Sequence, residues 1–202
     1  MARVAEHYEQ VEIKSVAALR KWLKQNHGRE QGVWLVHHKK HSPHYVPYGA
    51  IVDELLCIGW IDGLVRKVDA DRTMHLISPR KPKSIWSRVN KNKVAKLERE
   101  GRMTDAGRAV IDRAKEDGSW TIYDDVEKMV VPADLAQAFD KRARAAWEAF
   151  PDSVKKGALW WVKSAKTQAT RQKRIDKTAA MTRHGLRVNV PEDERKFREL
   201  TG

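Results

Sequence analysis

The chain has 202 residues, of which 41% are hydrophobic and 33% charged, and its 40 Lys and Arg against 27 Asp and Glu give a formal charge of +13. This length allows a hydrophobic core that needs neither disulfide nor metal, and the one cysteine, Cys57, excludes an intrachain disulfide. Residues 1–15 contain no apolar signal-peptide region, and no run approaches the roughly 18 apolar residues that span a bilayer. We therefore expect a cytoplasmic protein without a membrane span.

The chain begins with a predicted helix and strand. Ser15 is a typical N-cap, and the apolar spacing after it predicts a helix over residues 16–26. Residues 33–38 are rich in strand-forming side chains and predict a strand.

A largely apolar helix over residues 47–58 is expected to be the core helix. Pro47 suits its first turn, and Gly59 is placed for a left-handed cap at its end. Residues 64–68 and 74–78 then predict a β-hairpin, because turn-forming residues separate two strand-like runs.

After Pro79 the pattern predicts helices only. The first helix is expected from Ser87 or Asn90 to Gly101, and the second from Thr104 to about Glu116. The third begins at Pro132 and has an apolar stripe that reaches Phe150. The fourth is expected from Asp152 or Ser153 to Val162, and the fifth over residues 168–182. Strands in the first 80 residues and helices afterwards predict the α+β class, with a small antiparallel sheet, a packed core helix and a mostly helical second part. We expect an α+β domain over 1–120, a helical module over 121–189 and a polar tail over 190–202 that frays.

The densest basic segment spans residues 78–99, with eight Lys and Arg and one acid, Glu98. Arginine forks and serine hydroxyls at a helix start suit phosphate oxygens, and the Trp86 indole suits either base stacking or the core. The alternative is a solvated helix face. The candidate anion or nucleic-acid contacts are Arg80, Lys83, Ser84, Ser87, Arg88 and Lys91.

A second basic segment, residues 163–174, holds five cations and no acid and joins two predicted helices. Free backbone N–H groups at a helix start attract anions, although a solvent-facing turn has the same composition. Its candidate contacts are Lys166, Arg171, Lys173 and Arg174. We predict that the two basic segments form one anion-binding surface.

Metal binding is not expected, and no cofactor is implied. Four histidines lie close together in sequence, at positions 37, 38, 41 and 44, but no Cys, Asp or Glu lies between residues 31 and 52 to complete a site.

Catalysis is uncertain, with the sequence favouring a protein that is not an enzyme. No nucleotide-loop, serine-hydrolase or metalloprotease motif is present. Cys57 is expected to be a small buried hydrophobe, and Asp62 with Gly63 to form a turn before the hairpin. An enzyme would instead have a pocket lined by Trp60, Asp62, Trp86 and a histidine.

Several short motifs in order resemble one bacterial family. They are Val46-Pro47-Tyr48, the run Glu54-Leu55-Leu56-Cys57-Ile58-Gly59-Trp60-Ile61-Asp62-Gly63, Ser78-Pro79-Arg80, Lys83-Ser84-Ile85-Trp86-Ser87, Gly101-Arg102-Met103-Thr104 with Gly107, and a segment from Ala165 to Ile175. Over about residues 10–180 they resemble the YdeI/OmpD-associated, or bacteriocin-protection, family. The resemblance implies bacteriocin protection, or a link to an outer-membrane porin and cationic-peptide resistance, and it carries over no catalytic residue.

Three functions follow from these observations. The first is a non-enzymatic cytoplasmic binder of nucleic acid or another polyanion, and the second is a stress-resistance protein that acts through a protein partner. The third is an enzyme with the pocket described above. An outer-membrane partner would require export, for which residues 1–15 carry no signal, and a chain of charge +13 repels cationic peptides.

Overall fold

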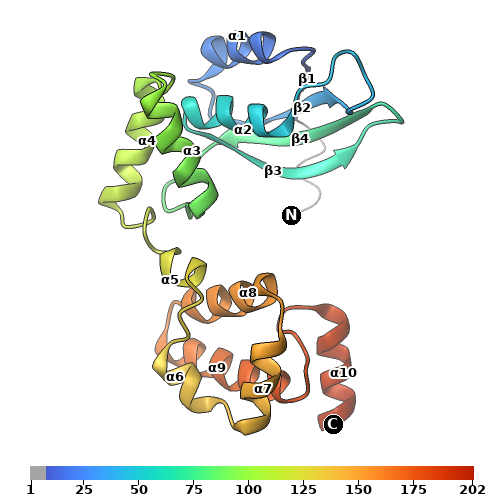
Figure 1. Ribbon diagram of the computed structural model, residues 1–202, viewed down its shortest axis with the longest axis vertical. Coiled ribbons are helices and arrows are strands. Elements are labelled where there is room, and N and C mark those ends of the chain that lie inside the picture. Colours follow the sequence, from blue (N-terminus) through green and yellow to red (C-terminus); the bar gives the residue numbers. More distant parts are fainter. Residues whose placement is uncertain (1–7) are drawn as a thin grey trace. The chain divides into compact units, whose positions relative to one another are not determined.

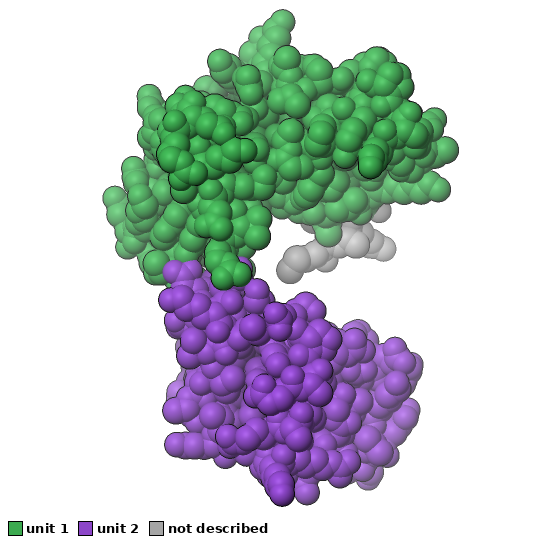
Figure 2. Space-filling view, viewed as in Figure 1, with its two compact units in different colours: residues 1–122 green, residues 123–202 purple. Residues whose placement is uncertain are grey.

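The structure is a computed structural model that describes residues 8–202 and divides the chain into two compact units, residues 1–122 and 123–202 (Figure 2). Residues 1–7, part of the segment in which no signal peptide was expected, lie outside the described residues. Among the described residues, no helix is long and apolar enough to cross a membrane.

Unit 1 contains a four-stranded sheet in the order β1-β2-β4-β3. Its elements are β1 Gln10–Glu12, α1 Val16–Asn26, β2 Val33–His38, α2 Tyr48–Cys57, β3 Trp60–Lys67, β4 Arg72–Pro79, α3 Arg88–Arg99 and α4 Asp105–Glu116 (Figure 1). The predicted α+β class is confirmed. The sheet is mixed rather than antiparallel, because the short strand β1, which the sequence did not indicate, runs parallel to β2.

The predicted core helix α2 packs against the sheet and α1. Leu55 lies in one buried cluster with Leu19 and Leu23 of α1 and with Leu35 and Ile77 of the sheet. The opposite side of α2 enters a second cluster with α3 and α4. Helix α2 is therefore apolar on most of its surface because it is covered on two sides.

Two glycines allow the end of α2 to pack closely. Gly59 has a φ of +77°, as predicted for a left-handed cap, and a Cβ there would lie 2.6 Å from Cγ2 of Val110. At Gly107 in α4 a Cβ would lie 2.3 Å from the carbonyl oxygen of Cys57. The backbones of α2 and α4 meet because neither position carries a side chain.

The hairpin is confirmed, but its first strand starts earlier than predicted. Asp62 and Gly63 were expected to form a turn, and instead they lie inside β3, whose pairing with β4 shifts register between Asp62 and Val65. The bulge accommodates Gly63 within the strand.

Unit 2 consists of helices. They are α5 Asp124–Glu127, α6 Ala133–Ala138, α7 Lys141–Ala149, α8 Asp152–Lys163, α9 Gln168–Arg183 and α10 Pro191–Thr201. Its core joins Leu135, Trp147, Leu159 and Ile175 from four of these helices.

Two predictions for unit 2 are wrong. The single helix expected from Pro132 to Phe150 is two helices, because Asp140 caps α7 by accepting a hydrogen bond from the backbone of Ala143 at 2.7 Å. The tail expected to fray forms α10, with Pro191 in its first turn and the buried Asp193 bound to Arg187.

Replacing Leu55 with Ala should lower the free energy of unfolding of unit 1 by about 2–5 kcal/mol, the usual cost of truncating a buried leucine. Urea denaturation measures the loss. Leu64→Ala is the control, because Leu64 is 54% exposed and its truncation should change stability little. Equal losses in the two variants would show that α2 is not the core helix.

Candidate functional site

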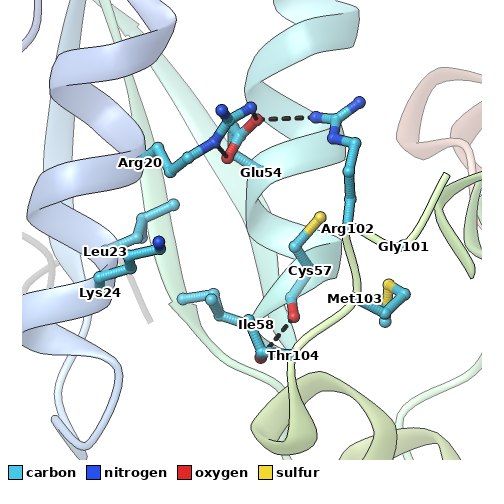
Figure 3. A pocket seen from close by; sticks show the side chains of 10 residues that line it. All are labelled: Arg20, Leu23, Lys24, Glu54, Cys57, Ile58, Gly101, Arg102, Met103 and Thr104. Atoms are coloured by element: carbon cyan, nitrogen blue, oxygen red, sulfur yellow. Dashed lines mark hydrogen bonds and ion pairs between the residues drawn. The ribbon is translucent and has the colours of Figure 1, made fainter.

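A pocket of about 320 Å³ lies in unit 1 between α1, the end of α2 and the loop that joins α3 to α4 (Figure 3). Ten residues line it: Arg20, Leu23, Lys24, Glu54, Cys57, Ile58, Gly101, Arg102, Met103 and Thr104. It therefore combines three cations and one carboxylate with apolar side chains.

The carboxylate of Glu54 is the centre of the pocket's polar wall. Its side chain is only 4% exposed. It accepts two hydrogen bonds from Arg20, at 2.9 Å from Nε and 2.6 Å from Nη2, and one from Nη2 of Arg102 at 2.7 Å (Figure 3). A buried charge requires such compensation, and two guanidinium groups provide it here.

The loop that carries Arg102 is fixed to the end of α2. Thr104 donates its hydroxyl to the carbonyl of Cys57 at 2.7 Å, and its backbone N–H bonds the same oxygen. The Thr104 hydroxyl also accepts from Gly107 and so caps α4, as the sequence predicted. Arg102 is therefore held beside Glu54 by the anchoring of its loop at Thr104 as well as by its own side chain.

Both arginine side chains also reach solvent. The side chains of Arg20 and Arg102 are 49% and 31% exposed. A guanidinium has five N–H groups, of which Glu54 engages two on Arg20 and one on Arg102, and Glu100 engages a further one on Arg102 at 3.1 Å. Hydrogen bonding to Glu54 raises the pKa of Arg20, so this group stays charged.

Cys57 lines the same pocket as a neutral thiol. Burial, followed by the charge of Glu54, raises the pKa of Cys57 to about 11. The thiolate is the nucleophilic form, so the pocket does not activate this cysteine at neutral pH.

The first basic segment lies in unit 1, and its residues are largely engaged within the fold. Arg80 was predicted as a surface phosphate contact, but it is buried, with its guanidinium carbon 3.7 Å from the centre of the Trp86 ring. Burial lowers its pKa to about 10. Trp86 is a core residue, one of the two alternatives that the sequence left open.

The other candidates of this segment have varied surroundings. Ser87 caps α3 through the N–H of Asn90, and Ser84 donates its hydroxyl to the carbonyl of Lys81. Lys83 and Arg88 are exposed, and Lys91 lies 5.4 Å from the ring centre of Trp120.

The second basic segment lies in unit 2. Arg171 binds both carboxylate oxygens of Asp134, at 2.7 and 2.9 Å, and Arg174 lies 5.3 Å from the ring centre of Trp161. Lys166 and Lys173 are exposed. Because the two segments belong to different units, their union in one surface stays a prediction.

The pocket predicted from Trp60, Asp62 and Trp86 does not form around the tryptophans. Trp60 and Trp86 are buried in two different core clusters. Asp62 instead accepts a hydrogen bond from the hydroxyl of Tyr48, whose ring stacks on His75 at 4.8 Å. The structure thus brings Asp62 near a histidine without either indole.

Among the described residues, several histidines pair with one another or with carboxylates. His75 hydrogen-bonds His37 at 2.8 Å, and burial lowers the pKa of both rings, so both are neutral at pH 7. His38 and His41 bind Glu12 and Asp71. Within residues 8–202 no three His, Cys, Asp or Glu side chains are arranged to hold a metal ion.

The two arginines of the pocket were not predicted from the sequence. Arg20 lies 34 residues before Glu54, and Arg102 lies 48 residues after it. The sequence did contain one signal for this pocket. Two of the motifs that carry the family resemblance, the runs that begin at Glu54 and at Gly101, both supply residues that line it.

Two family descriptions match the chain. Residues 128–185 match the family described as bacteriocin-protection, YdeI or OmpD-associated, and residues 11–110 match a domain of unknown function. The motifs of residues 46–107, on which much of the resemblance rested, thus fall within the second match, and the family resemblance is shown only for the carboxy-terminal part. No curated protein and no solved structure matches the chain.

Alkylation of Cys57 should report the pocket's electrostatics. Since its pKa is about 11, the labelling rate with iodoacetamide should rise about tenfold per pH unit from pH 7 to 10, following the thiolate fraction. A free cysteine, with a pKa of about 8.5, levels off near pH 9.5, and the urea-unfolded chain provides that control. A native profile that levels off with the control would contradict the raised pKa.

Proposed function

We propose, from the match of residues 128–185 to the bacteriocin-protection, YdeI or OmpD-associated family, that this protein has a protective role of the bacteriocin type. In this proposal it is a non-enzymatic cytoplasmic protein that binds a polyanion, nucleic acid above all, through the basic surface of unit 2. We define that surface as Trp161, Lys166, Lys173 and Arg174.

The observation that carries the proposal is the arrangement around Trp161. The Trp161 ring is half-buried and has Arg174 beside it, with Nζ of Lys177 at 5.9 Å. An aromatic ring among cations suits a single-stranded nucleic acid, since bases stack on the ring while cations hold the phosphates. All these residues lie within the family match.

Several cations of unit 2 form ion pairs inside the unit, and this narrows the choice of phosphate contacts. Arg171 binds Asp134, Lys163 binds Asp125 and Lys177 binds Glu194. Lys166 and Lys173 are exposed and lie near the start of α9, whose first-turn N–H groups favour an anion. These two lysines are therefore the best phosphate contacts to test.

The net charge determines how protection would work. A chain of charge +13 repels a cationic peptide, so direct capture of such a peptide is disfavoured. Binding to a polyanion, by contrast, gains from every exposed cation. The proposed protection is therefore indirect and acts through an acidic partner.

The test is the salt dependence of binding to labelled DNA and RNA, followed by fluorescence anisotropy. Lys166→Ala with Lys173→Ala should weaken binding to all sequences about equally and make the log–log salt slope on duplex DNA shallower by about 2, because two phosphate contacts are lost. Trp161→Phe should weaken single-stranded binding more than duplex binding.

The matched control is Lys141→Ala with Arg142→Ala, which removes two exposed charges from α7. If the two double variants lose the same affinity for DNA and RNA, the loss follows from net charge alone and not from a contact at Lys166 or Lys173. If the native chain binds neither DNA nor RNA at low salt, the polyanion proposal fails and a protein partner takes its place.

A further inference from the structure

We propose that the pocket between Arg20 and Arg102 in unit 1 is a binding site for a small organic anion, a carboxylate or phosphate group attached to a short apolar body. This site is independent of the basic surface of unit 2. It lies within the residues that match the domain of unknown function.

The donors for the anionic group are already positioned. Glu54 accepts hydrogen bonds from both guanidinium groups through the same oxygen, Oε1, at 2.6 Å and 2.7 Å. This arrangement fixes two flexible side chains at the pocket wall before any ligand binds. Fixing donors in advance reduces the entropy that a ligand must overcome.

The charge at the pocket favours an added anion. Arg20, Lys24 and Arg102 line it, against Glu54 in the wall and Glu100 beside Arg102. One positive charge remains in excess, and two guanidinium groups of like charge share one buried carboxylate. Cys57 is neutral and therefore does not repel an anion.

The rest of the pocket selects the body of the ligand. Leu23, Ile58 and Met103 supply its apolar lining. Its volume of about 320 Å³ is near the lower limit of ligand pockets, which start at roughly 300 Å³. A small aromatic or branched acid fits these limits, and a polymer does not.

A purely structural role for the three charges is the alternative explanation. The hydrogen bonds of Glu54 tie α1, α2 and the loop of Arg102 together, and this alone would justify them. It does not explain why both arginines line a pocket whose wall also contains apolar side chains (Figure 3). Binding measurements separate the two explanations.

Isothermal calorimetry on the full chain should use four probes: benzoate, phenyl phosphate, inorganic phosphate and the neutral benzamide. We expect saturable one-to-one binding of benzoate or phenyl phosphate, and the tighter of the two identifies the anionic group. Inorganic phosphate and benzamide should bind at least tenfold more weakly, because inorganic phosphate lacks the apolar body and benzamide lacks the anionic group. The same ligand should slow alkylation of Cys57, the chain's one cysteine.

The variants Arg20→Gln and Arg102→Gln should each weaken binding by about 10- to 100-fold, the equivalent of one charged hydrogen bond. Each leaves Glu54 one guanidinium partner, so the fold should persist, and circular dichroism verifies it. Arg102→Lys keeps the charge without the fork and should recover part of the affinity. Arg113→Gln, at an exposed position in α4 outside the pocket, is the matched control.

Three results would overturn this proposal: no saturable binding of either organic anion, equal binding of benzamide and benzoate, or an equal loss in Arg113→Gln. The double variant of Lys166 and Lys173 should leave the binding of benzoate and phenyl phosphate unchanged. The pocket and the basic surface of unit 2 can therefore fail separately.

Discussion

The buried carboxylate of Glu54 ties three segments of unit 1 together. A carboxylate removed from water must find charged partners, and it finds them in Arg20 of α1 and Arg102 of the loop before α4. The close contact of Gly107 in α4 with the end of α2 brings that loop near enough for Arg102 to reach Glu54. The same requirement that fixes three segments also places two guanidinium groups at a pocket.

Binding rather than chemistry is the common theme of both proposals. Burial keeps Cys57 in its thiol form and lowers the pKa of His37 and His75. The pocket of unit 1 offers positioned donors to a small anion, and the surface of unit 2 offers exposed cations beside Trp161.

Local signals predicted most of the fold, and contacts distant in sequence escaped prediction. Ser15, Ser87 and Thr104 cap their helices as expected, because a cap depends on residues only three positions away. Asp140 carries the same signal, but the apolar stripe that continues across it hid the break. The partners of Glu54 lie 34 and 48 residues away, and nothing within one helix indicates which arginine will reach a carboxylate.

Arginine side-chain NMR shows whether Glu54 holds two guanidinium groups in place at the pocket. The Nε–H of Arg20 and the Nη–H₂ group of Arg102 should give resonances that are shifted and slow to exchange at neutral pH, and both should join the averaged arginine signals in Glu54→Gln. Arginine spectra that are the same in the native chain and in Glu54→Gln would show that Glu54 does not hold these groups.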